Sequence, residues 1–274
     1  MNKVSISTGC LPRLENCRFY ELSSVIRMME RFLKESKLDG FEFVLLPEWD
    51  CENPPLTPTT ALSECEKHSI DELIETLEPR NYPLLSVHAN RDIGSYLCSE
   101  KIDLINKGTR LIDECLTFTQ RMGCKICVFH FWDTWKESFN IDFLIDVYRR
   151  FQTVYPQIDI SIENIPTRHW EKSPFQIVKN FKHKTLDLKW ASMFNEFSLF
   201  NEIMGEVDNI HVQGKHQDGS IIPTIGNLNY EMALQMIQAA GYTRAFTIEL
   251  EGTAHYDEVL KYFEKLKNSA ILSS

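Results

Sequence analysis

The segment Ile158-Asp-Ile-Ser-Ile-Glu-Asn-Ile-Pro166 combines a strand pattern with an acidic end. Isoleucines at every second position from 158 to 162 share one face of a short β-strand, and Glu163 ends the opposite, polar face. Asn164 and the turn-forming Pro166 follow. A carboxylate in this place suits a purely structural strand poorly. It indicates that the carboxyl end of the strand opens into a functional site.

Strand patterns alternate with helical patterns along the rest of the chain. The expected strands are 4–8, 40–46, 83–88, 125–130, 158–163, 184–188, 208–212 and 245–250. The expected helices are 20–37, 70–77, 100–122, 141–154, 175–180, 195–204, 230–240 and 256–267. Alternating units of this kind form a parallel sheet, and eight of them form a barrel. The sequence therefore predicts the α/β class and a single (β/α)8 TIM-barrel domain over 1–274, with a frayed tail at about 268–274.

Bulk composition narrows the function further. The chain has 274 residues, is 43% hydrophobic and carries a formal charge of -10, which argues against nucleic acid as a partner. It shows no apolar signal segment at its start and no run long enough to span a membrane. The eight cysteines are scattered, and Cys124 and Cys127 lie in an expected strand, where we expect both in the core. These features predict a cytoplasmic protein with reduced thiols and no membrane association.

Polar residues recur near the carboxyl ends of six consecutive expected strands. Alternate residues of a barrel strand face outward and inward. If the mainly apolar set faces outward, the inward residues nearest the strand ends are His88, His130, Glu163, Asp187, His211 and Glu249. Three carboxylates aimed at one point would repel one another unless a cation lies among them.

We therefore expect one divalent metal ion, Mn²⁺, Zn²⁺, Mg²⁺ or Fe²⁺, in this place. Its expected ligands are Glu163, Asp187, His211 and Glu249. Each residue alone has a simpler interpretation: a single histidine is often structural, and Asp187 could pair with Lys189 or cap a loop. Glu251 is the main rival of Glu249, because both have the same parity.

The sequence resembles the xylose isomerase-like TIM barrels, which include sugar isomerases, ketose 3-epimerases and AP endonuclease family 2. The motifs that carry the resemblance are Ser161-Ile-Glu-Asn164, Leu186-Asp187, Asn209-Ile-His211-Val, Thr247-Ile-Glu249-Leu, Gly226-Asn-Leu-Asn-Tyr230 and Gly241-Tyr. The resemblance implies the same four metal ligands, with Glu163 and Glu249 also acting as catalytic acid and base on a bound carbohydrate through an enediolate. It also makes a homodimer an expectation.

The remaining candidates are residues that would bind substrate. They are His88, His130, Asn164, Lys189, Trp190 and Trp132. Tryptophans beside a polar centre suit the apolar face of a sugar ring, but they could equally cover the barrel or a partner interface. Lys189 could meet a substrate phosphate or be an ordinary surface charge.

Two departures from the pattern of the epimerases favour the alternative of a barrel that has lost catalysis. Trp190 stands where the epimerases usually have a histidine, and Gln217 stands where they have an arginine. The first hypothesis is a metal-dependent isomerase or epimerase of a sugar, sugar phosphate or polyol. The alternatives are a metal-dependent phosphodiesterase of the AP endonuclease kind, whose histidines on the third and fourth strands match His88 and His130, and a barrel that has lost catalysis and acts as a binding protein.

Overall fold

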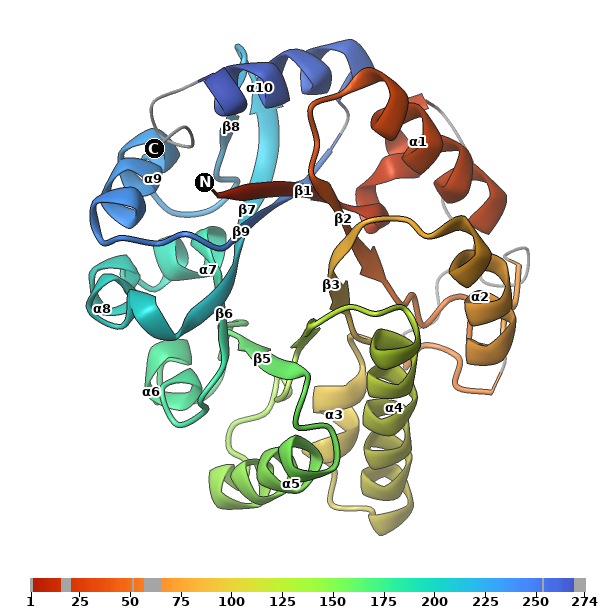
Figure 1. Cartoon of the computed structure of the whole chain (residues 1–274). Helices are drawn as coiled ribbons and strands as arrows, with labels where there is room; N and C mark the ends of the chain where they lie inside the picture. Colours follow the sequence, from red (N-terminus) through yellow and green to blue (C-terminus); the bar gives the residue numbers. More distant parts are fainter. Residues whose placement is uncertain (1, 16–20, 51, 57–65, 253, 269–274) are drawn as a thin grey trace. The chain divides into compact units, whose positions relative to one another are not determined.

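Strands and helices alternate along the chain in the computed structural model, which describes residues 2–15, 21–50, 52–56, 66–252 and 254–268 (Figure 1). The strands are β1 (Lys3–Ser7), β2 (Gly40–Val44), β3 (Leu84–His88), β4 (Ile126–Phe129), β5 (Asp159–Glu163), β6 (Lys184–Asp187), β7 (Val207–Gln217), β8 (Ser220–Ile222) and β9 (Ala245–Leu250). The α-helices are α1 (Leu22–Glu35), α2 (Ile70–Leu77), α3 (Ile93–Leu97), α4 (Ile102–Arg121), α5 (Ile141–Val154), α6 (Pro174–Val178), α7 (Leu188–Met193), α8 (Phe197–Glu202), α9 (Tyr230–Ala239) and α10 (Tyr256–Asn268). Short 3₁₀ helices are η1 (Thr8–Glu15), η3 (Glu78–Arg80) and η4 (Met204–Glu206).

The strand order confirms the predicted fold class. It runs β6-β5-β4-β3-β2-β1-β9-β7, and β6 also pairs with β7, so each of these eight strands has a neighbour on both sides. Successive strands are joined through helices (Figure 1). This is the connectivity of a (β/α)8 barrel.

The chain divides into two compact units, 1–42 with 185–274 and 43–184, whose boundaries fall inside β2 and β6. We call them the first and second units. In the first, β1 pairs in parallel with both β2 and β9, and β9 pairs with β7. In the second, β4 pairs in parallel with β3 and β5. The predicted single domain over 1–274 stays a prediction.

Helix boundaries follow from local chemistry. Ser69 and Glu72 form a capping box at the start of α2, where each side chain binds the backbone N–H of the other. Asn140 and Asn229 cap α5 and α9 by a single bond each, accepting from a backbone N–H of the first turn. Along α1, buried apolar side chains recur at helical spacing.

The structure adds elements that the sequence patterns did not indicate. The expected loop after β3 contains α3, whose Gly94 has no room for a side chain: an added Cβ would lie 2.3 Å from the carbonyl oxygen of Trp132. Between the strand expected to end at 212 and the helix expected from 230, the structure has a hairpin, because β7 continues to Gln217 and pairs antiparallel with β8.

Several smaller predictions have an outcome as well. Cys124 and Cys127 are both buried, as expected. In the described part of the chain no helix has the length and apolar character needed to cross a membrane. Helix α10 ends at Asn268, and the rest of the predicted tail lies outside the described residues.

Candidate functional site

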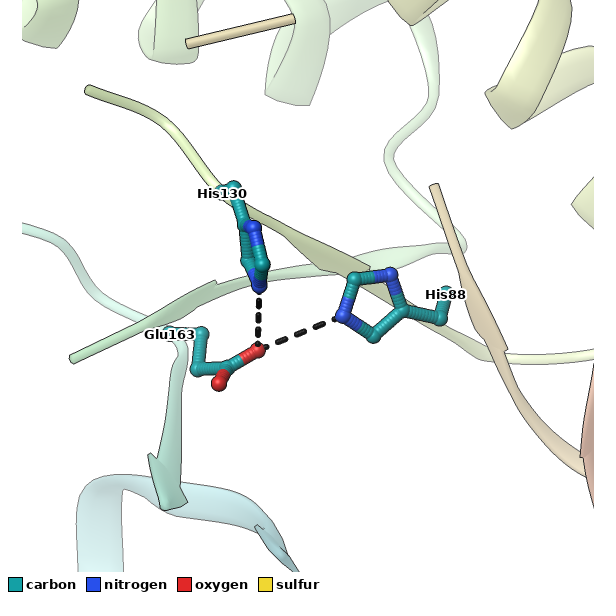
Figure 2. Close-up of side chains that lie close together, drawn as sticks. All are labelled: His88, His130 and Glu163. Atoms are coloured by element: carbon teal, nitrogen blue, oxygen red, sulfur yellow. Dashed lines mark hydrogen bonds and ion pairs between the residues drawn. The ribbon is translucent and has the colours of Figure 1, made fainter. Parts of the chain in front are cut away.

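In the second unit, two imidazoles converge on one carboxylate oxygen (Figure 2). His88 ends β3, His130 follows β4 directly and Glu163 ends β5. The Nε2 atoms of His88 and His130 lie 3.3 Å and 3.1 Å from Oε2 of Glu163. Because adjacent parallel strands bring their ends together, three neighbouring strands place these groups at one point.

The position of the proton on the His88 ring indicates what this cluster could bind. Its Nδ1 lies 2.9 Å from the carbonyl oxygen of Ala89, and because a carbonyl only accepts, Nδ1 carries the proton. In neutral His88 the Nε2 atom therefore presents a lone pair to the carboxylate of Glu163. Two hydrogen-bond acceptors, Nε2 of His88 and Oε2 of Glu163, would then face each other, which is unfavourable unless a proton or a cation lies between them. Two imidazoles and a carboxylate, with donor atoms all within 4.8 Å of one another, suit Zn²⁺, Fe²⁺ or Mn²⁺.

In the first unit, His211 lies between two carboxylates. Its Nε2 atom is 3.1 Å from Oε2 of Glu42, and its Nδ1 atom is 3.7 Å from Oε1 of Glu249. Glu42 and His211 are fully buried, and the Glu249 side chain is 18% exposed. The longer distance exceeds a hydrogen bond but leaves Nδ1 and the Glu249 carboxylate close enough to share a cation. The donor set of carboxylate oxygen and imidazole nitrogen fits the expected divalent ion.

Asp187 ends β6 and also begins the next helix. Its Oδ1 accepts from the backbone N–H of Trp190 at 3.0 Å, so it is the N-cap of α7. This is one of the simpler roles considered for Asp187, and it engages one carboxylate oxygen only. The same hydrogen bond holds the backbone of Trp190 in the first turn of α7.

Carboxylates of the first unit contribute to the raised pKa values of two neighbouring groups, the Cys10 thiol and the Tyr230 hydroxyl. Burial raises the pKa of the Cys10 thiol to about 12, and the charge of Glu249 adds to the rise. Burial also raises the pKa of the Tyr230 hydroxyl above its usual range, and the carboxylates of Asp187 and Glu251 raise it further. A cation bound near these carboxylates would offset that charge.

Lys189 and Glu251 pair with each other. The ammonium group of Lys189 forms an ion pair with Oε1 of Glu251, and it also lies 4.2 Å from the centre of the Trp190 ring. Thr224 donates to the other oxygen of Glu251. Lys189 is therefore neither a freely exposed surface charge nor a partner of Asp187. Glu251, the rival candidate for the strand-end ligand, has both oxygens engaged by these two side chains.

Trp132 and Asn164, two of the expected substrate-binding residues, are buried in the second unit. The indole N–H of Trp132 donates to the carbonyl oxygen of Pro166 at 3.3 Å. That bond ties the segment after β4 to the segment after β5. For Trp132 this contact agrees with the covering role that the sequence left open, while a substrate contact for either residue stays a prediction.

Glu42 is the site residue that the sequence patterns missed. It lies on β2 between Phe41 and Phe43, and both phenylalanines are fully buried. The sequence did contain a signal for it, an acidic residue between two aromatic residues of a strand. Successive side chains of a strand face opposite sides, so the carboxylate lies on the face opposite the two phenylalanines. Glu42 lies in the middle of β2, whereas the pattern of candidate ligands in the sequence indicates residues near strand ends.

Comparisons with known proteins place this geometry in context. No model of a protein family matches the chain, and no curated protein is significantly similar to it in sequence. Solved structures are similar to it: 3-keto-D-glucoside 4-epimerase YcjR from E. coli has a TM-score of 0.62 and 15% identity, with 97% of this chain and 98% of that chain covered. An AP endonuclease of family 2 from Brucella melitensis has a TM-score of 0.65 and 14% identity, covering 96% and 98%. A sugar phosphate isomerase/epimerase from Parabacteroides distasonis has a TM-score of 0.65 and 13% identity, covering 100% and 98%.

The chain has the fold of these proteins. The resemblance predicted from the strand-end motifs is thus confirmed for the fold over nearly the whole chain.

Proposed function

We propose that the protein is a divalent-metal-dependent isomerase or epimerase of a small sugar, sugar phosphate or polyol. The observation that carries the proposal is the proximity of imidazole and carboxylate groups within each unit, where His88 and His130 lie beside Glu163 and His211 lies beside Glu249. The likeness in fold to sugar epimerases supports it, and some of those proteins are described with D-allulose or D-tagatose.

The proposed metal ligands are Glu163, Asp187, His211 and Glu249. A bound divalent ion would supply positive charge to the carbonyl and adjacent hydroxyl oxygens of the substrate. His88 and His130 would orient the Glu163 carboxylate through the contacts at its Oε2 atom. Lys189 and Trp190 would lie against the substrate, with the ammonium group already held over the indole ring.

The proposed chemistry is a proton transfer between carbons or between faces of one carbon. One of Glu163 and Glu249, ionised, takes the proton from the carbon next to the carbonyl group. The electron pair of the broken C–H bond forms a C=C bond, and the carbonyl oxygen becomes the oxyanion of an enediolate. The other glutamate, protonated, returns a proton to carbon. Return of the proton to the opposite face of the same carbon re-forms the original carbonyl group and gives epimerisation. Return to the former carbonyl carbon gives isomerisation, in which the proton of the adjacent hydroxyl passes to the oxyanion and that hydroxyl oxygen becomes the new carbonyl.

The test measures bound metal and carbon-bound proton exchange together. The purified protein, loaded with Mn²⁺, is incubated in D₂O with D-tagatose, D-allulose and a panel of ketose phosphates, and deuterium incorporation is followed by NMR. We expect incorporation at the carbon next to the carbonyl group of at least one sugar, and loss of most of this activity in Glu163→Gln. A metal-loaded protein that exchanges no proton on any of these sugars contradicts the proposal.

The cluster of His88, His130 and Glu163 favours a second candidate, a metal-dependent phosphodiesterase. Its three donor atoms lie within 4.8 Å of one another inside the second unit, and the fold is also that of an AP endonuclease of family 2. This candidate predicts two or three ions per chain and nicking of a DNA duplex that contains an abasic site. One ion and no nicking would dismiss it, and a chain that binds no metal would support the binding-protein alternative instead.

A further inference from the structure

A buried chain of hydrogen bonds ends at His211. Its members lie on four strands of the first unit, and each of them is fully buried: Ser5, Thr247, Asn209, Glu42 and His211. The hydroxyl oxygens of Ser5 and Thr247 are 2.9 Å apart, and the Thr247 hydroxyl donates to Oδ1 of Asn209 at 3.0 Å. The side-chain amide of Asn209 then donates to Oε2 of Glu42 at 3.0 Å. The same oxygen lies 3.1 Å from Nε2 of His211.

The direction of these bonds fixes the proton on His211. Because Oδ1 of Asn209 accepts from Thr247, its Nδ2 group faces Glu42 and donates. An ionised Glu42 carboxylate can only accept, so toward it the Nε2 atom of His211 is the donor. In the neutral ring, Nδ1 is then the atom with the lone pair, and it is the atom on the side of Glu249.

We propose that Glu42 is a positioning residue that holds His211 as the Nε2–H tautomer and thereby directs the Nδ1 lone pair at a divalent cation. The role of the cation rests on the proposed function, whereas the tautomer does not. A carboxylate that accepts the second ring proton of a ligating histidine also makes the ring a stronger ligand. Asn209 and Thr247 support this role, because they hold the carboxylate at the position where it meets the ring.

Two substitutions separate the hydrogen bond of Glu42 from its charge. Glu42→Gln keeps an acceptor oxygen for Asn209 and His211 but removes the charge, and Glu42→Leu removes both. The matched control is Glu48→Gln, which neutralises another buried carboxylate, one that pairs with Arg91 in the second unit. The tautomer of His211 is read from ¹⁵N–¹H spectra of the metal-free protein, and the Kd for Mn²⁺ is measured by calorimetry.

We expect the Nε2–H tautomer in the wild type, in Glu42→Gln and in the control. Glu42→Leu should lose this tautomer preference. The Kd for Mn²⁺ should rise about 10-fold in Glu42→Gln and up to about 100-fold in Glu42→Leu, and stay unchanged in the control. A folded Glu42→Leu protein with the wild-type tautomer and a Kd within about twofold of the wild type overturns the proposal.

Two further outcomes keep the inference separate from the proposed function. If the wild type binds no divalent ion, the proposed function fails, and the tautomer comparison still decides the role of Glu42. If Glu42→Leu does not fold, Glu42→Gln decides it, because an unchanged Kd for Mn²⁺ in that variant contradicts the proposal.

Discussion

Glu114 on α4 is a half-buried carboxyl group with other acidic side chains nearby. Burial raises its pKa, and the charges of Asp50 and Glu52 raise it further. A raised carboxyl pKa means that the folded state binds the proton more tightly than the unfolded state does. The resulting stabilisation is fully present below the unfolded pKa and is lost as the pH rises through the folded pKa.

Glu114→Gln resembles the protonated form at every pH. We expect its Tm to exceed that of the wild type by roughly 1–3 °C at pH 7.5 and to equal it at pH 3.5. Glu231 is the control of opposite sign, because its hydrogen bond with Lys265 lowers its pKa. Glu231→Gln should therefore lower the Tm slightly at pH 7.5 and have no effect at low pH. Equal thermal melts of Glu114→Gln and wild type at pH 7.5 would contradict this account.

Glu42 illustrates what the sequence does not predict for a single residue, namely its contact partners. The alternation of side chains along a strand predicts that its carboxylate lies on the polar face. It does not predict which residues the carboxylate contacts. Those partners, His211 and Asn209, come from β7, which lies more than a hundred residues later in the chain. The same holds for Lys189 and Glu251, whose ion pair joins two distant segments. Strand-end residues could be predicted as a set, whereas their pairings depend on register.

At the scale of elements, the β7–β8 hairpin was missed although its turn carries a recognisable signal. Asp218 and Gly219 both have positive φ, at 51° and 74°, and they link Gln217 to its partner Ser220. Two left-handed residues in a two-residue loop match the twist of paired strands, and Asp-Gly is a common sequence for it. The flanking residues are largely polar and do not alternate, so periodicity indicated a loop.

Two glycines near this hairpin differ in what a side chain would meet. Both have positive φ, but a Cβ at Gly219 would meet no atom within 4 Å, whereas one at Gly226 would lie 2.1 Å from Oγ of Ser192 and 2.8 Å from its backbone carbon. We expect Gly219→Ala to lower the free energy of unfolding by about 1 kcal/mol, through backbone strain alone. Gly226→Ala should cost about 2–4 kcal/mol, because the clash adds to the strain.

Urea unfolding of both variants tests this difference. Gly205→Ala is the control, because its φ is not in the left-handed region and its Cβ also meets nothing within 4 Å. It should change the free energy of unfolding by less than about 0.5 kcal/mol. Equal costs at Gly219 and Gly226 would show that the contact of Gly226 with Ser192 contributes nothing.

At the scale of the whole chain, the barrel topology was predictable for a physical reason. A parallel sheet needs a crossover after each strand, so strand and helix patterns must alternate, and this alternation is visible in hydrophobic spacing alone. The bounds of α2 and α5 match the helices predicted from hydrophobic spacing, and a capping side chain stands at the start of each. The short α3 and α7 were missed, and α6 and α8, which are equally short, were predicted with different bounds, because five or six residues show little of the helical period.

The proposed metal centre makes a prediction for the whole molecule, because its four ligands come from both compact units. We expect one Mn²⁺ per chain by elemental analysis. At a free concentration 100-fold above Kd, the ion should stabilise the fold by about 2.7 kcal/mol and raise the Tm by roughly 5–10 °C. If the ion is shared, Glu163→Gln and His211→Asn should each abolish both the bound metal and the thermal shift, while Glu48→Gln should keep them. Two ions in the wild type, with one retained in each variant, would instead mean that each unit holds its own ion, and that result would favour the phosphodiesterase over the epimerase.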